Sequence, residues 1–397
     1  MHRRNTPQNG VHAKVFPMVI LVLLGVVLTP LTSSTEAPYR EVNTCTLLED
    51  LQFDGTLANA SVQWQVDLGP RIPGSDASAS FRSSIGENLT ALGYEVSQQS
   101  HERYDMNLTN LFARWTPSGA SSGQLVLSAH YDSRNIADQD SNETNRSLPV
   151  PGANDAASGV AVLLELARHI PSMDLGYDVV LFFNDAEDQN HRYTLGAEAW
   201  AQNLTTEEIA STHAFVLLDM VGDADLQLHN VLPGNETLKT RVVELATSLG
   251  MVNQTSGCDG SPGRDIVQYD TLVGVLDDHV HAHELGIPSI DLMDTSYGEP
   301  KPYTFGSLWH TMEDTPDKVS AESLESVGRL VELGLLSNAF VDVSPTDEEG
   351  NLSGPADDEP TPEEVESAGS KRLALMAAVG LFSILGLILT AEWKGKP

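Results

Sequence analysis

Acidic and histidine side chains follow several apolar runs of this sequence, each at the point where the run ends. They are His130 and Asp132 after 125–129, Glu187 and Asp188 after 179–183, Asp219 after 215–218, Asp155 in a turn that opens a helix, and His310 in a loop rich in Gly, Tyr and Pro. Ligands in open α/β sheets bind beyond the carboxyl ends of strands, so we expect these groups to meet at one edge of a sheet. Imidazole nitrogen and carboxylate oxygen form a donor set that zinc accepts. Because burying so many carboxylates without a cation is costly, the pattern predicts a metal site.

Each of these motifs has an ordinary structural explanation when it is taken alone. A His-x-Asp at a strand end is commonly a hydrogen-bonded pair, and adjacent acids such as Glu187 and Asp188 are commonly solvated. Asp219 has the position of a turn residue, and Asp155 has that of a helix N-cap. What favours a metal is that all of these groups fall at the same predicted edge.

The elements that position these residues follow from the apolar periodicity. Short runs rich in β-branched residues alternate with helical patterns, which predicts an α/β domain whose mostly parallel sheet carries helices on both faces. The predicted strands are 94–98, 111–115, 125–130, 179–183, 215–220 and 289–292. The predicted helices are 77–92, 157–170, 197–204, 236–249, 278–285 and 317–338.

Taken in order along the chain, the motifs resemble metallopeptidase family 28, the group of zinc aminopeptidases and glutaminyl cyclases. The resemblance covers about 290 residues, 49–338. It rests on Asp-Leu-Gly-Pro-Arg-Ile-Pro-Gly-Ser at 67–75, the segments around His130, Asp155, Glu187 and Asp219, Asp-Asp-His at 277–279, Gly-Ile-Pro at 286–288, and Trp-His-Thr-Met-Glu-Asp-Thr at 309–315. It implies a three-layer α/β/α domain of the zinc exopeptidase type over 32–341, with a mixed, mostly parallel central sheet.

The resemblance also implies a metal-ligand set. Asp155, Asp188 and His310 would bind zinc, and members with two zinc ions add His130 and Asp219, with Asp155 bridging the pair. Whether one or two ions are bound stays open.

Roles for the neighbouring acids come from the same resemblance. Glu187 would be the general acid/base, and Asp132 would orient His130 from behind, as a carboxylate often does for a metal-bound imidazole. Asp188 departs from the family, because many members have Glu there. Its shorter side chain still ligates through oxygen, with a shifted metal position.

Two chemistries share such a site. A hydrolytic aminopeptidase uses a zinc-activated water, and Glu187 passes its proton to the leaving amine. In a glutaminyl cyclase the zinc polarises the γ-amide of an N-terminal Gln, and Glu187 moves a proton from the α-amine to the departing ammonia. In either case Glu187 needs a raised pKa, which neighbouring carboxylates help to provide.

Details of the sequence favour the cyclase. By resemblance, Asp219 and Asp277 would support the proton relay, and Trp309 would line the pocket for the N-terminal residue, although simple core packing of Trp309 is the alternative. Two details favour the aminopeptidase instead. The segment 155–160 looks more like the aminopeptidase version, and after Glu187 and Asp188 only Tyr193 is a candidate aromatic wall.

Two further alternatives concern histidines and activity. His279, His281 and His283 alternate, and on a helix residues two apart point about 200° away from each other, so they do not all bind one ion. We expect His281 and His283 at the surface and His279 behind the site. An inactive relative that binds peptides is a third function class, but such proteins usually lose the ligands or the acid/base, and this chain keeps them.

Composition limits the partners. Lys and Arg number 22 against 56 Asp and Glu, giving a net charge of −34 and a pI near 4.4. Binding to nucleic acid is therefore not expected, because phosphates require cations. Only Cys45 and Cys258 are present, so a cysteine-based zinc cluster is excluded and one disulfide is optional.

The two ends of the chain carry membrane signals. Arg3, Arg4 and Lys14 precede the apolar run 15–28, which is typical of a signal peptide or signal anchor within 1–31, with cleavage undecided. The uncharged run 373–390 predicts a transmembrane helix over 371–393, followed by a short basic tail at 394–397. An acidic, Pro-rich linker at 342–370 would tether the domain to it.

Nine Asn-x-Ser/Thr sequons lie between the apolar ends. They are at Asn59, Asn88, Asn107, Asn142, Asn145, Asn203, Asn235, Asn253 and Asn351. Glycosylation of these residues requires an outward-facing domain. We therefore expect a cell-membrane protein whose catalytic domain is extracytoplasmic and acts on peptide or protein N-termini.

Overall fold

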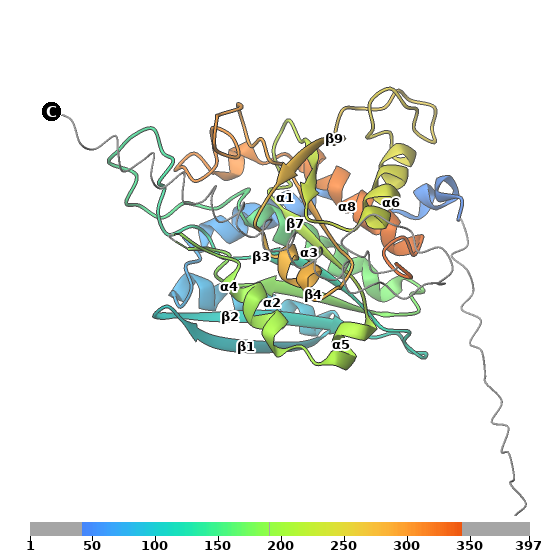
Figure 1. The fold of residues 1–397 in the computed structure, drawn as a ribbon, viewed down its shortest axis with the longest axis horizontal. Coiled ribbons are helices and arrows are strands. Elements are labelled where there is room, and N and C mark those ends of the chain that lie inside the picture. Colours follow the sequence, from blue (N-terminus) through green and yellow to red (C-terminus); the bar gives the residue numbers. More distant parts are fainter. Residues whose placement is uncertain (1–41, 190, 344–397) are drawn as a thin grey trace, which may run out of the picture. The chain divides into compact units, whose positions relative to one another are not determined.

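A six-stranded sheet runs through the computed structural model, which describes residues 42–189 and 191–343 (Figure 1). In spatial order the strands are β1 (Glu95–Arg103), β2 (Met106–Trp115), β4 (Asp178–Asn184), β3 (Gln124–His130), β7 (Thr212–Asp219) and β10 (Ser289–Met293). β2 pairs antiparallel with both β1 and β4, whereas β4, β3, β7 and β10 run parallel to one another. The sheet is mixed and mostly parallel, as predicted.

Helices cover both faces of this sheet (Figure 1). The larger core lies under α1 (Gly55–Asp67), α2 (Asp76–Ala91), α3 (Ala157–His169), α6 (Glu236–Ser248) and α8 (Ala321–Leu336). The smaller core, on the opposite face, lies under α4 (Leu195–Asn203), α5 (Thr206–Ser211) and α7 (His279–Glu284). The predicted three-layer α/β/α arrangement is therefore confirmed.

The central strands supply both cores. All seven residues of β3 are buried; Leu125 and Leu127 pack into the larger core and Val126 into the smaller one. Successive side chains of a strand point to opposite faces, so a strand covered on both sides is apolar throughout. This is why β3, β4 and β7 are recognisable from sequence.

Close packing at the carboxyl edge of the sheet brings the site residues together. A Cβ atom added to Gly159 would lie 2.2 Å from the carbonyl oxygen of Leu218, so glycine lets the first turn of α3 pack against the end of β7. Asp155, just before α3, lies within 4.8 Å of Asp219, the last residue of β7, measured between their ligand atoms.

Several elements were not predicted. Helix α1 has a weakly apolar buried face made of Ala58, Val62 and Gln65. The strands β8 (Leu228–Leu232) and β9 (Val267–Gly274) form a separate parallel pair, and β5 (Asp188–Gln189) and β6 (Arg192–Tyr193) form a short hairpin. Short 3-10 segments occupy Thr44–Asp50, Ile170–Ser172 and Pro316–Lys318. The last helix begins later than predicted because Ser320 caps it, accepting the backbone N–H of Ser323.

Cys45 and Cys258 form a disulfide, with a Cα–Cα distance of 5.5 Å. The bond joins the 3-10 segment Thr44–Asp50 to the loop after α6. The sequence left this pairing open, because a separation of 213 residues says nothing about distance in the fold.

Among the residues that the structure describes, no helix is both long and apolar enough to cross a membrane. The apolar runs 15–28 and 373–390 lie outside the described residues, as does the linker beyond Val343. Val341 and Val343 themselves pack into the larger core.

Candidate metal centre

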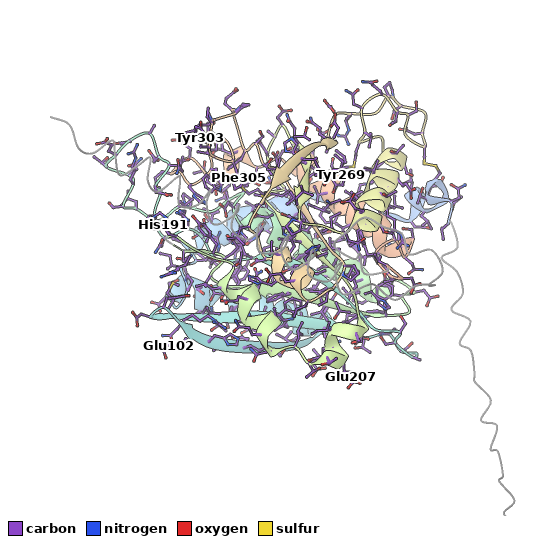
Figure 2. The ribbon with its side chains drawn as sticks, in the orientation of Figure 1. Glu102, His191, Glu207, Tyr269, Tyr303 and Phe305 are labelled. Carbon is purple, nitrogen blue, oxygen red and sulfur yellow. A yellow bond between two sulfur atoms is a disulfide. The ribbon has the colours of Figure 1, made fainter. Side chains whose placement is uncertain are left out.

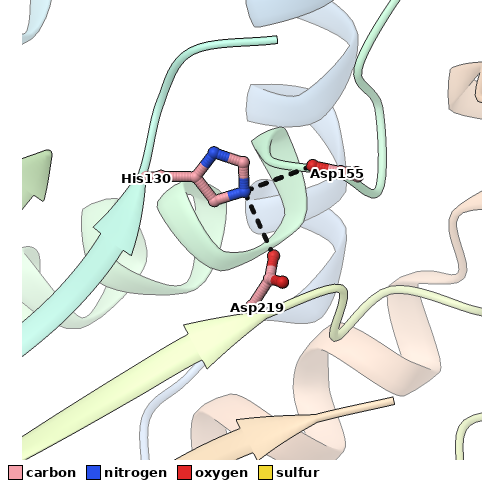
Figure 3. A group of neighbouring side chains, drawn as sticks. All are labelled: His130, Asp155 and Asp219. Atoms are coloured by element: carbon pink, nitrogen blue, oxygen red, sulfur yellow. Dashed lines mark hydrogen bonds and ion pairs between the residues drawn. The ribbon is translucent and has the colours of Figure 1, made fainter. Parts of the chain in front are cut away.

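His130 lies between two carboxylates at the carboxyl edge of the sheet. Its Nε2 is 3.2 Å from Oδ1 of Asp155 and 3.2 Å from Oδ1 of Asp219 (Figure 3). All three residues are buried. Burial disfavours protonation of His130, but its contacts with Asp132, Asp155 and Asp219 outweigh this effect and raise its pKa well above the usual value. The negative charge around this imidazole thus attracts a cation.

A second group shares Asp155 with the first. Nε2 of His310 lies 2.8 Å from Oδ2 of Asp188 and 3.7 Å from Oδ2 of Asp155. The two oxygens of Asp155 therefore face different histidines, an arrangement suited to a carboxylate that bridges two ions. Each group can bring its ligand atoms within 4.8 Å of one another, the spacing needed to surround a metal ion.

The donor set fits a divalent metal of the zinc type. Oδ2 of Asp188 is buried and accepts no hydrogen bond from any described residue, although it lies next to His310. A buried carboxylate oxygen without a donor is costly unless a cation takes that place. Two imidazoles and three carboxylates, with no thiolate, match the oxygen and nitrogen ligands that zinc binds.

Asp132 contacts more groups than the one histidine predicted from the sequence. Its Oδ1 lies 3.3 Å from Nδ1 of His130, and its two oxygens accept the backbone N–H groups of Glu187 at 3.0 Å and Asp188 at 3.1 Å. It also accepts Nε2 of Gln189 at 2.8 Å. One buried carboxylate thus fixes the end of β3 relative to the acidic segment after β4.

Asp314 performs a similar task for the turn that carries Asp155. Its carboxylate accepts the backbone N–H of Asn154 at 2.7 Å and of Asp155 at 3.3 Å. Tyr297 donates its hydroxyl to the same carboxylate at 2.9 Å. The family-like segment 309–315 therefore contributes a support for Asp155 as well as His310.

Glu187 lines a pocket above these groups and is nearly buried. Burial raises its pKa well above the ordinary value, and the nearby charge of Asp277 raises it further. Asp277 lines the same pocket, and burial followed by the charge of Asp291 raises its pKa as well. The two carboxyls are thus suited to holding and passing a proton.

The pocket has a volume of about 240 Å³ and largely apolar walls. Its apolar lining consists of Tyr193, Val275, Leu276, Met293, Phe305 and Trp309. Trp309 is half-buried and stacks on His310 with a ring-centroid distance of 3.4 Å; it lines the pocket and also packs against a small hydrophobic cluster that includes Val275 and Met293. Phe305, marked in Figure 2, meets the edge of Trp309 at 5.1 Å.

The three alternating histidines lie on α7 and do different things. His279 is buried, with Nε2 3.0 Å from the carbonyl oxygen of Pro233 and Nδ1 3.6 Å from Oδ2 of Asp291. His281 is only half-buried and meets Oγ1 of Thr194 at 2.9 Å, and His283 is also half-buried. The expectation that the latter two are surface residues was therefore only partly right, because α7 packs against α4 and the loop before it.

Residues to which the sequence analysis assigned no role complete the site. They are Arg134, Asp138, Asp291, Asp314 and Phe305. Of these, Asp291 left a signal in the sequence, since it is the one acid inside the apolar strand Ser289–Met293. Arg134 and Asp138 lie in an irregular loop, where no periodicity marks burial.

Comparison with known proteins agrees with this geometry. The model of peptidase family M28 matches residues 110–333, more than half of the chain. The chain belongs to peptidase family M28. The resemblance drawn from the motifs is confirmed, and the matched region holds all of the residues proposed as ligands.

Relatives within the family bear two kinds of name. A glutaminyl-peptide cyclotransferase from Boiga dendrophila is 26% identical over 319 residues, covering 70% of this chain and 81% of the relative. The crystal structure of Porphyromonas gingivalis glutaminyl cyclase is similar with a TM-score of 0.62 and 29% identity, over 72% of this chain and 98% of the other. A Zn-dependent exopeptidase from Parabacteroides distasonis is equally similar, with a TM-score of 0.62, 28% identity, and 72% and 99% coverage.

Proposed function

We propose that this protein is a zinc-dependent enzyme that acts on peptide N-termini, as a glutaminyl-peptide cyclotransferase. The observation that carries the proposal is the placement of Glu187 and Asp277 in one small, apolar-walled pocket directly above the metal ligands. The similarity to cyclotransferases over most of their length supports it.

Asp155, Asp188 and His310 would hold the zinc ion. His130 and Asp219 would complete a second site with Asp155, so the measured ratio of zinc to protein distinguishes one ion from two. When bound, zinc polarises a carbonyl of the substrate and stabilises negative charge on its oxygen.

The remaining chemistry belongs to Glu187. The α-amine of an N-terminal Gln attacks its own γ-amide carbon, forming the ring C–N bond. Glu187 accepts the proton that this nitrogen loses and delivers it to the amide nitrogen as its bond to carbon breaks, so that ammonia leaves. A raised pKa suits a group that must both accept and donate within one turnover. The charge of the nearby Asp277 carboxyl helps to raise the pKa of Glu187.

The pocket walls serve this cyclisation by shape. An N-terminal side chain that must fold back on its own amine needs a small cavity, and Trp309, Phe305 and Tyr193 line a cavity of this kind. Excluding water also protects against hydrolysis, because a competing water would attack the same carbon.

The alternative is a zinc aminopeptidase. The similarity to the Zn-dependent exopeptidase from Parabacteroides distasonis supports it, whereas the group around His130 suits a second metal ion in either enzyme. In that reaction Glu187 would take a proton from an attacking water and give it to the leaving amine, and the N-terminal residue would be released.

A direct assay separates the two activities. The purified full-length chain, loaded with zinc, is incubated with one peptide beginning with Gln and another beginning with Leu, and both are followed by mass spectrometry. We expect the Gln peptide to lose the mass of one ammonia molecule while the Leu peptide stays intact. Release of the first residue from the Leu peptide would instead establish the aminopeptidase, and no change in either peptide would support an inactive peptide-binding relative.

We also propose that the enzyme is tethered to the cell membrane with its catalytic domain outside. The apolar segments 15–28 and 373–390, the acidic linker at 342–370 and the Cys45–Cys258 disulfide support this arrangement. Asn88, Asn107, Asn142, Asn203 and Asn253 are exposed sequon residues, whereas Asn235 is buried. Protease added to intact cells should digest the domain; its complete protection would contradict the proposal.

A further inference from the structure

Arg134 is among the largest fully buried side chains of the described residues, with 1% of its surface exposed. It lies four residues after His130, in the loop that leaves β3. A guanidinium is always charged at ordinary pH, so burying it requires anionic partners with good geometry. The partners of Arg134 indicate why a charged side chain is buried at this position.

Arg134 contacts two carboxylates with different edges of its planar group. Its Nε donates to Oδ1 of Asp138 at 2.8 Å, and its Nη2 donates to Oδ2 of Asp138 at 3.1 Å. Its Nη1 donates to Oδ1 of Asp188. Because the guanidinium is rigid, these bonds fix the two carboxylates relative to each other.

The same two carboxylates meet His310. Oδ1 of Asp138 lies 3.5 Å from Nδ1 of His310, while Oδ2 of Asp188 lies 2.8 Å from Nε2 of that ring. Arg134, Asp138, His310 and Asp188 therefore form a closed ring of contacts. Asp138 faces one nitrogen of the imidazole and leaves the other nitrogen for the metal.

We propose that Arg134, together with Asp138, is a positioning device for two of the three zinc ligands. Arg134 holds Oδ1 of Asp188, so that only Oδ2 faces the ion. The carboxylate of Asp138, 3.5 Å from Nδ1 of His310, favours the tautomer protonated at that nitrogen, which leaves Nε2 with its lone pair. The inference rests on the proposed zinc site and deepens it.

Arg134 anchors Asp188 from inside the protein, and the ring of Tyr193 covers the guanidinium at 5.8 Å.

Charge and geometry predict opposite changes in zinc affinity when the Arg134 side chain is removed. A positive charge beside a zinc site repels the ion, so on charge alone its removal would strengthen zinc binding. Loss of ligand orientation weakens binding, and removing such outer partners typically costs about 10- to 100-fold in metal affinity. The sign of the change therefore decides between a positioning role and a merely electrostatic one.

The test compares zinc dissociation constants, measured by competition with a chromophoric chelator on purified full-length chains. Arg134→Met should raise the constant about 10- to 100-fold. Arg134→Lys should restore little of this, because a single ammonium does not bridge two carboxylates. The matched control is Arg114→Met, which removes an arginine paired with Asp178 at the amino end of β4, on the opposite edge of the sheet. Its zinc constant should match that of the parent.

Asp138→Asn provides a second test of the positioning role, since Asp138 is partly exposed and its substitution is mild. It should also weaken zinc binding, and the absorption spectrum of the cobalt-substituted chain should change in both variants as ligand geometry relaxes. Folded Arg134→Met or Asp138→Asn chains that bind zinc as tightly as the parent, or more tightly, would overturn the inference. A parent chain that binds no zinc would instead contradict the proposed function itself.

Discussion

Asp132 accepts the backbone N–H of Glu187 at 3.0 Å, across 55 positions of sequence. This hydrogen bond ties the end of β3 to the residue proposed as the acid/base. The same carboxylate faces His130, so one buried group sets the positions of a ligand and of the proton carrier. Burial raises the pKa of Asp132, but the contact with His130 and other hydrogen bonds outweigh it and lower the pKa, which keeps the group charged.

Replacing Asp132 with Asn should therefore disturb the positions of both His130 and Glu187. An amide keeps one acceptor oxygen and presents an N–H₂ group to a backbone N–H that needs an acceptor. We expect a loss of about 1–3 kcal/mol in the free energy of unfolding and a clear fall in turnover. Urea unfolding and the peptide assay measure these separately. Unchanged turnover in a folded Asp132→Asn chain would contradict the positioning role.

Glu187→Gln should nearly abolish turnover while zinc stays bound. The amide has the same shape but neither accepts nor donates the proton, and such groups contribute about 10²- to 10⁴-fold to rate. Elemental analysis checks the zinc, and the peptide assay checks the rate. Glu313→Gln is the control, because Glu313 is an exposed acid three residues from His310. A Glu187→Gln enzyme as fast as the control would rule out the assigned role.

Asp155→Ala should remove zinc from the protein. Asp155 contributes an oxygen to both candidate groups, so its loss leaves each with two ligands. We expect metal content per chain, measured after dialysis against buffer, to fall close to zero. Asp225→Ala, an exposed acid in the loop before β8, should keep the parent's metal content. Full zinc in Asp155→Ala would refute the ligand assignment.

The sequence predicted the elements whose patterns are local and missed those that depend on tertiary contacts. β3, β4 and β7 are buried on both faces, so their continuous apolar runs marked them, and the polar residues at their ends marked the site. Helix α1 was missed because its buried face includes Gln65, whose Nε2 donates to the carbonyl oxygen of Ala157.

Within the site, the same distinction holds. His130 and Asp219 are the last residues of β3 and β7, so their meeting at the carboxyl edge of a parallel sheet could be inferred from the sequence. Arg134 and Asp138 face each other from one irregular loop, and only the fold shows that an arginine there is buried. His281 was expected at the surface because helix periodicity does not reveal a hydrogen bond to Thr194 from another segment.

The disulfide should contribute measurably to stability. Linking Cys45 and Cys258 closes a loop of more than 200 residues, which restricts the unfolded chain. Replacing both residues with Ser should lower the free energy of unfolding by about 2–4 kcal/mol. A reducing agent should destabilise the parent by a similar amount and leave the double variant unaffected. Equal stability of parent and double variant would contradict this expectation.

Asp294, which follows β10, predicts a pH dependence of stability. Burial raises its pKa from 3.8 to about 7, although the backbone N–H groups of Gln227 and Ser296 donate to it. Between these pH values the folded state binds the proton and the unfolded state does not. Stability therefore falls as pH rises through this window.

The Asp294→Asn variant has no carboxyl at this position, so it does not show this fall in stability. Its free energy of unfolding relative to the parent should rise between about pH 4 and about pH 7, even though the amide forfeits one backbone hydrogen bond at every pH. Urea unfolding at several pH values measures the difference, with Asp225→Asn as the exposed control. A difference that stays constant with pH would show that Asp294 ionises at its ordinary pKa in the folded protein.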